Sequence, residues 1–297
     1  MQETSPDRSA RSTESLLLVV VLIWAANAPV VKFGILGMDV VVFNSIRFLI
    51  AAAILLSIHR VRSEWLSVSR TDWPKLVGLG LIAHVLYQFA YLYGLKNTTV
   101  GNSAIILSTS PLWTVFLNSA IHKERVPRQA WSGTGVSLLG IILIVIGTGS
   151  TVSFGGDAVL GDVLSLGAAL MWALSTTLQK SFLKTYSASQ LASIMVSVGA
   201  IAWTLLAIPS SFDLRWSGIG MGYYFAAVGS GALSTGASNV LWARGIKKLG
   251  PRRTANFNNL VPILAFVFAY LFLGETIYPL QILGAGVTLV GVYLARR

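Results

Sequence analysis

Four polar or aromatic side chains fall on one face of a predicted helix within residues 84–91. They are His84, Tyr87, Gln88 and Tyr91. Residues spaced at i, i+3, i+4 and i+7 share one helical face. Their imidazole, amide and phenol groups can hydrogen-bond a small molecule, and their rings can stack against it. The spacing therefore predicts a surface that binds a solute.

A similar stripe follows 151 positions later in the chain. Its members are Thr235, Ser238, Asn239 and Trp242. Both stripes lie in apolar runs, where hydrogen-bonding groups that faced lipid would stay unsatisfied. Two stripes that face each other across a cavity would use these groups. We expect both to line a cavity, and the alternative is hydrogen bonding between helices.

Five further residues are candidates for binding a solute because they place polar or aromatic groups inside apolar runs. They are Trp24, Asn27, Trp172, Asn256 and Asn259. The two tryptophans lie deeper than an aromatic belt at a membrane surface would place them. Their rings suit a cavity that holds an aromatic or cationic solute.

Two lysines and two prolines are candidates for gates or hinges. Lys32 and Lys180 each stand eight positions after a tryptophan, which predicts one gate on each side of the cavity. The alternative is that both ammonium groups extend to the membrane surface. Pro111 and Pro262 lie within apolar runs, where proline removes a backbone hydrogen bond and can kink a helix. Each is either a hinge or a static kink.

Enzymatic, metal and redox chemistry have little support in the sequence. The chain has no cysteine, and its histidines are His59, His84 and His122, with no H-E-x-x-H motif. Arg47 is the only full charge well inside an apolar run, which makes it a functional candidate. Its structural alternative is hydrogen bonding to backbone carbonyls. We expect no enzyme, no metal site and no cofactor.

The elements that carry these residues are apolar enough to cross a membrane. Hydrophobic residues make up 54% of the chain, charged residues 11%, and the mean hydropathy is +0.70, whereas about a quarter of the residues in a soluble domain are charged. Ten runs approach the length of a membrane-spanning helix: 16–34, 40–58, 75–95, 101–121, 129–148, 161–183, 190–209, 218–243, 254–273 and 279–295. The prediction is an all-α integral membrane protein with the lipid bilayer as its partner.

The net charge of +11 follows the topology of a membrane protein and does not require nucleic acid. With a cytoplasmic N-terminus, most of the 22 lysines and arginines fall in cytoplasmic segments, and Lys32, Lys96 and Arg215 fall at outer ends or in outer loops. We expect the cell (inner) membrane, with both termini cytoplasmic. A signal peptide cleaved near Ala26-Asn27-Ala28 is the alternative, but the same pattern recurs at 171–180.

The chain repeats itself. A shift of 151 positions aligns residues 94–140 with 245–291 and pairs Pro111 with Pro262, and a shift of 148 pairs Trp24 with Trp172. Two five-helix halves result, 1–150 and 151–297. Because five is odd, the second half must enter the membrane inverted, and inverted repeats are typical of secondary transporters.

Three motifs resemble the EamA family of the drug/metabolite transporter superfamily. They are WAANAPVVK, YGLKNTTVGNSAIILSTSPLWTVFLNSAIHKER and LGETIYPLQILGAGVTLVGVYL, and the resemblance covers essentially the whole chain. It implies ten helices and the export of amino acids, metabolites or drugs. The chain is also similar in overall character to the YddG-type aromatic amino-acid exporters.

The sequence thus favours a secondary transporter that exports small organic solutes by alternating access, with aromatic or other apolar amino acids first. No carboxylate lies at mid-membrane depth, so we expect a uniporter. The alternatives are proton coupling through His84, a drug or metabolite as the cargo, and, third, a solute channel. The oligomeric state stays open, a monomer included.

Overall fold

The computed structural model describes residues 8–62, 67–123, 128–147, 157–274 and 276–294. Within these ranges every regular element is helical, and no strand occurs. The elements group into ten helical segments that match the ten predicted runs, five before the gap at 148–156 and five after it. The predicted boundary between residues 150 and 151 lies outside the described residues.

The first five segments are α1 (Arg8–Gly37), α2 (Val40–Arg62), α3 (Trp73–Leu81) with η1 (Ile82–Leu86) and α4 (Tyr87–Asn97), α5 (Val100–Leu107) with α6 (Ser110–His122), and α7 (Arg128–Gly147). The second five are α8 (Asp157–Phe182), α9 (Ala188–Asp213), α10 (Met221–Gly229) with η3 (Ser230–Ala237) and α11 (Ser238–Leu249), α12 (Pro251–Ala255) with η4 (Asn256–Leu260) and α13 (Val261–Leu273), and α14 (Pro279–Leu294). A short 3₁₀ turn, η2 (Trp216–Gly218), precedes α10.

Segments three, four, eight and nine are not the continuous α-helices that the apolar runs predict. Segments three and eight each contain a π-helical stretch, η1 and η3, at corresponding positions. Segment four is broken between α5 and α6, and segment nine contains the 3₁₀ turn η4. A π turn widens a helix by one residue and is found mostly at functional sites. The four interrupted segments are therefore candidates for forming a functional site.

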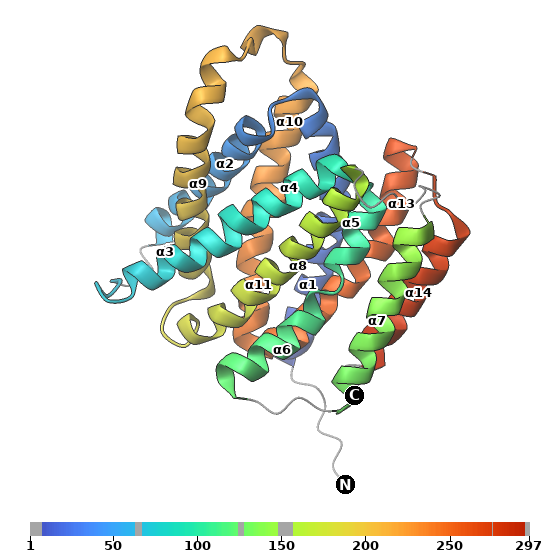
Figure 1. The fold of residues 1–297 in the computed structure, drawn as a ribbon. Coiled ribbons are helices and arrows are strands. Elements are labelled where there is room, and N and C mark those ends of the chain that lie inside the picture. The colour runs from blue at the N-terminus through green and yellow to red at the C-terminus, as the bar shows by residue number, and fades with distance from the viewer. Residues whose placement is uncertain (1–7, 63–66, 124–127, 148–156, 275, 295–297) are drawn as a thin grey trace.

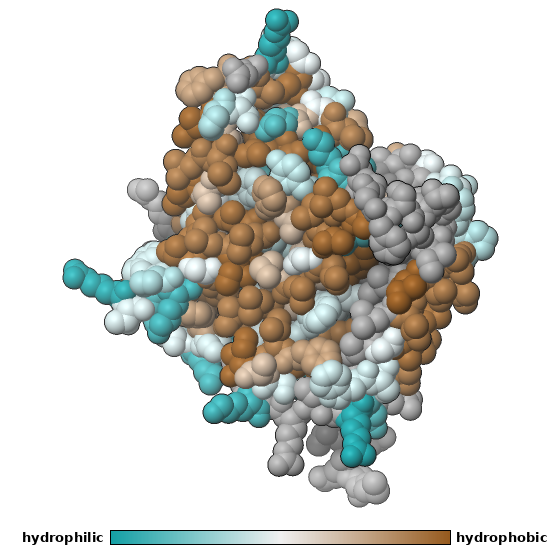
Figure 2. Space-filling view, in the orientation of Figure 1, coloured by the Kyte–Doolittle hydropathy of each residue, from teal (hydrophilic) through white to brown (hydrophobic). Residues whose placement is uncertain are grey.

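The surface is that of a membrane protein. Five described helices are long and apolar enough to span a membrane, namely Ser12–Gly37, Val40–His59, Trp73–Asn97, Ala158–Phe182 and Ala188–Phe212. Large apolar side chains such as Phe212 and Phe225 point outward, at 83% and 70% exposure. Figure 2 shows hydrophobic side chains across the middle of one face and hydrophilic ones toward its ends. Such an apolar surface suits lipid.

The largest contacts between helices have counterparts when the two halves of the chain are exchanged. Helix α2 packs on α9, and α7 packs on α14 to form one edge of the molecule (Figure 1). Helix α1 packs on α10, α11 and α13, and its counterpart α8 packs on α4, α5 and α6. Even the helix caps correspond: Asp39 accepts backbone N–H bonds at the start of α2, and Ser187 does so at the start of α9. The fold is therefore two inverted five-helix repeats.

The α7–α14 contact shows the symmetry at the level of single residues. A side chain at Gly140 would overlap Thr288, and one at Gly291 would overlap Ser137. The hydroxyl of Ser137 donates to the carbonyl oxygen of Thr288 at 3.1 Å. Small residues let helices approach closely where both partners are apolar and lipid supplies no hydrophobic drive.

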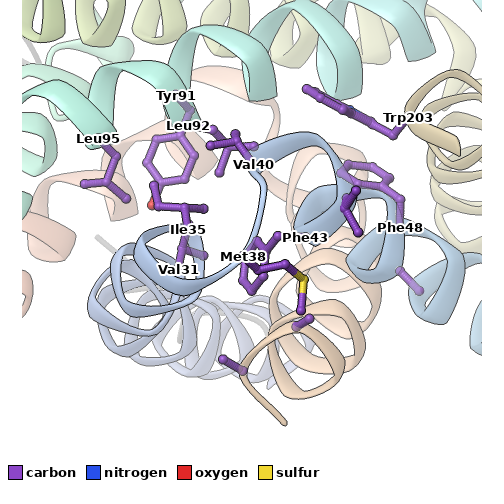
Figure 3. Close-up of a cluster of buried hydrophobic side chains, with 14 of the residues drawn as sticks. Val31, Ile35, Met38, Val40, Phe43, Phe48, Tyr91, Leu92, Leu95 and Trp203 are labelled. Carbon is purple, nitrogen blue, oxygen red and sulfur yellow. The ribbon is translucent and has the colours of Figure 1, made fainter. Parts of the chain in front are cut away.

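A buried apolar cluster lies where α1, α2, α4 and α9 meet. Figure 3 shows Ile35, Phe43, Phe48, Leu92 and Trp203 in this cluster. The indole N–H of Trp203 donates to the carbonyl oxygen of His84 at 2.6 Å, within the π-helical turn η1. This contact anchors the interrupted third segment to α9, which leaves its opposite face for the centre of the molecule.

Candidate functional site

A partly open cavity of about 100 Å³ lies between the two repeats. Its wall comes from α1, α2, η1, α4, α5, α6, α8, η3, α11, η4 and α13. The interrupted segments three, four, eight and nine all contribute to this wall, so the breaks in the helices surround the cavity.

The structure brings eight of the predicted binding residues together in the wall of this cavity. They are Trp24, Asn27, His84, Tyr87, Gln88, Tyr91, Trp172 and Asn239. The whole 84–91 stripe is among them, which agrees with the cavity lining predicted for it. Both repeats contribute. That these side chains bind a solute stays a prediction.

The prediction that the second stripe lines the cavity is only partly correct. Ser238 and Trp242 are buried but do not line the cavity, which receives Ser234, Thr235 and Asn239 from this segment. Trp242 packs against the cavity residues Trp24 and Trp172 instead, with ring centroids 5.0 and 5.5 Å away. Ser234 was not among the predicted residues.

The second of the three asparagines in residues 256–259, and neither of the two predicted ones, is the one described at the cavity. Asn258 lines the cavity and donates to the hydroxyl of Ser110 at 3.2 Å. The side chains of Asn256, Asn259 and Pro262 lie outside the described ones. The sequence offered no means of choosing among the three amides, because the turn at η4 is 3₁₀ rather than α.

Three tryptophans and two tyrosines form one aromatic group beside the cavity. The ring centroids of Trp24 and Trp172 are 5.2 Å apart, and both contact Trp242 behind them, at 5.0 and 5.5 Å. Tyr87 lies 5.1 Å from Trp172 and stacks on Tyr91 at 5.8 Å. Trp242 is thus a packing partner of the cavity tryptophans. Such a group can hold an apolar or aromatic body.

Arg47 is the unexpected member of the wall. Its guanidinium is buried, with 1% of the residue exposed, and lines the cavity. Its acceptors are side chains, not the backbone carbonyls that we considered: Ser230 at 2.7 Å, Asn44 at 2.8 Å, Thr235 at 3.3 Å and Gln88 at 3.4 Å. All four are neutral. Among the described residues no carboxylate forms an ion pair with Arg47.

Two buried polar atoms in the wall have no hydrogen-bond partner in the described structure. They are Nε2 of His84 and Nε1 of Trp172. Buried polar groups are nearly always paired, so each unpaired one needs an explanation. Both belong to residues that line the cavity.

Lys32 connects α1 to the end of α4. Its ammonium group donates to the carbonyl oxygens of Leu95 and Thr98, at the end of α4. The last carbonyls of a helix lack donors from the helix itself, and a cation there is favourable. The Thr98 hydroxyl donates in turn to Asp162 of α8 at 2.8 Å. Lys180 is half-buried near the end of α8. A gating role for either lysine stays a prediction.

The two prolines begin helices. Pro111 follows Ser110 at the start of α6, and Pro262 follows Val261 at the start of α13. Proline is favoured in the first helical turn, where its missing N–H would have no partner. The apolar run of residues 101–121 is interrupted at Ser108 and Thr109, just before Pro111, where proline removes a backbone hydrogen bond. Whether the break acts as a hinge is untested.

Comparison with known proteins follows the same division of the chain. The model of the EamA-like transporter family matches residues 11–146 and 159–297. The chain is 27% identical to the uncharacterized transporter YyaM of Bacillus subtilis, covering 84% of this chain and 82% of that one. It is 24% identical to a probable amino-acid metabolite efflux pump of Salmonella typhimurium, over 96% and 95% of the two chains.

A solved crystal structure shares the fold, with a TM-score of 0.74 and 18% identity over 96% of this chain and 98% of that one. The protein described here belongs to the EamA-like transporter family. The resemblance seen in the sequence is thereby confirmed, and the chain is a multi-pass membrane transporter. The likeness to YddG-type exporters stays a prediction.

Proposed function

We propose that this member of the EamA-like transporter family is a secondary transporter that exports small organic solutes, with aromatic and other apolar amino acids as its preferred cargo. One observation carries the proposal: a cavity between inverted repeats combines tryptophan and tyrosine rings with amide and hydroxyl groups from both repeats. Rings suit an apolar side chain, and the polar groups suit the ends of an amino acid. The relative from Salmonella typhimurium, named a probable amino-acid metabolite efflux pump, supports this cargo.

Alternating access follows from the arrangement. Two inverted repeats provide similar contacts on both sides of a central site, so either side can close while the other opens. The interrupted segments lie around the cavity and supply places where the backbone can bend. We propose uniport, because the described residues that line the cavity include no aspartate or glutamate.

Proton coupling through His84 is the second candidate, because Nε2 of His84 is buried in the wall without a partner. A pH gradient imposed across proteoliposomes separates the two candidates. Accumulation of labelled solute driven by that gradient alone would favour proton coupling, and exchange that ignores the gradient would favour uniport.

We also propose the cell (inner) membrane as the location, with both termini cytoplasmic. Figure 1 supports the shared side, since α1 begins and α14 ends at the same end of the molecule. The positive-inside distribution of lysine and arginine supports the cytoplasmic side.

Counterflow in proteoliposomes tests the proposal. Liposomes loaded with unlabelled phenylalanine receive a trace of labelled phenylalanine outside at equal pH. We expect transient uptake above that of empty liposomes, with saturation and trans-stimulation that a channel would not show. Absence of uptake for phenylalanine, methionine and threonine would remove the amino-acid cargo and leave a drug or metabolite.

A further inference from the structure

We propose that Arg47 binds the carboxylate of the cargo, so that the cavity takes monocarboxylates with an aromatic or apolar body and does not require their amino group. This inference rests on the proposed function and names the chemical feature that the site recognises.

The surroundings of Arg47 leave its charge uncompensated. Four hydrogen bonds join the guanidinium to Asn44, Gln88, Ser230 and Thr235. All four acceptors are neutral, and four of the five N–H donors of a guanidinium are accounted for, which leaves one on Nη2. A buried cation is costly unless an anion pairs with it. Arg47 thus has a donor and a charge to offer at the cavity wall.

The inverted repeat shows that packing does not require this charge. Arg47 and Met195 are the eighth residues of α2 and α9, which begin at Val40 and Ala188. Gly231 of η3 packs on the backbone of Arg47, and Gly80 of α3 packs beside the backbone carbonyl of Met195. Gly80 lies closer still to the side chain of Val198, so the two contacts correspond in place but not in detail, and the second repeat fills its position with a buried apolar side chain. The arginine therefore needs an explanation other than the fold.

The neighbours of Arg47 show the same difference. Ser230 and Asn44, which accept from its guanidinium, correspond in the repeat to Leu79 and Ala192, both buried. Two of the four acceptors thus have apolar counterparts, whereas Gln88 and Thr235 correspond to the polar residues Asn239 and His84. A shell of neutral acceptors orients the guanidinium without neutralising it, which is what a site for an anionic ligand requires.

Residues next to each other on α4 connect this charge to the aromatic group. Gln88 contacts the guanidinium of Arg47 at 3.4 Å, while Tyr87 contacts the ring of Trp172 at 5.1 Å. A small solute can therefore place its carboxylate at Arg47 and its ring among Tyr87, Trp172 and Trp24. The unpaired Nε2 of His84 and Nε1 of Trp172 lie in the same wall and offer further polar contacts.

The amino group of such a solute has no matching anion. The described residues that line the cavity include no aspartate or glutamate, so Arg47 gives the wall a net positive charge. A monocarboxylate neutralises this charge, whereas a primary amine without a carboxylate adds to it. The site should therefore rank 3-phenylpropionate at least equal to phenylalanine, and both far above 2-phenylethylamine.

Competition and binding by these three compounds test the proposal on the full-length protein. Each is added to phenylalanine counterflow, and each is also tested for thermal stabilisation of the purified protein in detergent. We expect the two carboxylates to compete within a few-fold of each other and the amine to compete at least about tenfold more weakly, as expected for lost hydrogen bonds to a charged group. An amine that competes as well as the carboxylates would overturn the assignment.

Arg47→Gln should stay folded and lose the preference for carboxylates, while the exposed Arg215→Gln keeps it. A preference retained in Arg47→Gln would also overturn the proposal, and the ligand series on the wild type decides the question if this variant does not fold. If phenylalanine shows no counterflow but 3-phenylpropionate still stabilises the protein in a way that depends on Arg47, only the amino-acid cargo is refuted. If phenylalanine counterflow is intact but 2-phenylethylamine inhibits it as well as 3-phenylpropionate does, only the role of Arg47 is refuted.

Discussion

The ammonium nitrogen of Lys32 lies 2.8 Å from the carbonyl oxygen of Thr98 and joins α1 to the end of α4. The same ammonium also donates to the carbonyl oxygen of Leu95, which lines the cavity. The Lys32 side chain on α1 thus connects the first and third segments beside the site. Thr98 extends the connection to Asp162 of α8.

Removal of this tie should loosen the cavity at that end. We expect Lys32→Ala to raise the labelling rate of a single cysteine at Val100, a buried cavity residue, by about tenfold, because hydrogen bonds to a charged group contribute about 1.5–3 kcal/mol each. The chain has no cysteine of its own, so the label reports one site. Lys96→Ala removes an exposed lysine on α4 as the control, and equal rates in both variants would contradict a gating role.

Replacing Arg47 by methionine, the residue at the equivalent position 195 of the second repeat, should test whether Arg47 serves transport or folding. We expect Arg47→Met to fold, because the second repeat buries Met195 at the equivalent position, although the acceptors that lose their donor should lower its stability by about 1–3 kcal/mol. Counterflow of phenylalanine should be lost. A melting temperature lowered by more than about 10 °C would mean that the arginine serves stability after all.

The α7–α14 contact should depend on one glycine and not on its neighbour. Gly140→Val should destabilise the protein by about 1–3 kcal/mol, because its side chain would overlap Thr288. Gly135→Val on the same helix is the matched control, since nothing lies within 4 Å of a Cβ there. Thermal unfolding followed by tryptophan fluorescence measures both. Equal melting temperatures would contradict the close approach of the two helices.

The aromatic group should select aromatic cargo. Trp172→Ala should weaken the binding of phenylalanine more than that of threonine in counterflow. Contacts between the Trp172 ring and an aromatic solute contribute about 0.5–1.5 kcal/mol beyond burial, or up to about tenfold in affinity. Trp172→Phe should restore most of this affinity. The control is Trp131→Ala, which removes a tryptophan that is 61% exposed. Equal losses for phenylalanine and threonine would indicate a general structural role for Trp172.

The sequence predicts the segments well and the interruptions poorly. Apolar runs locate all ten helical segments because length and hydropathy decide whether a helix can cross a membrane. The 84–91 stripe reaches the cavity as predicted, whereas Ser238 and Trp242 do not, and Trp242 packs against Trp24 and Trp172 instead. Contacts between helices decide which side chain of a stripe reaches the cavity, and hydropathy alone does not show them.

Partners of charged groups also escape prediction from sequence alone. Arg47 was recognisable as a charge inside a span, but its contacts with Ser230 and Thr235 join residues far apart in the chain. Lys32 could equally have extended to the membrane surface, and only the position of the α4 terminus makes it a helix cap. The internal repeat offers partial help, because it shows which positions keep their residue type and which, like Arg47 and Met195, do not.

Movement of Arg47 through part of the bilayer would make a step of transport sensitive to voltage. A charge that crosses a membrane completely does about 2.3 kcal/mol of electrical work per 100 mV, and a partial displacement does a fraction of that. Arg47 sits inside a described span with neutral partners only, so any motion of α2 relative to the bilayer carries this charge with it. An anionic cargo at Arg47 would cancel it. The empty and the loaded protein would then differ in electrogenicity, and membrane potential would act on the return step alone.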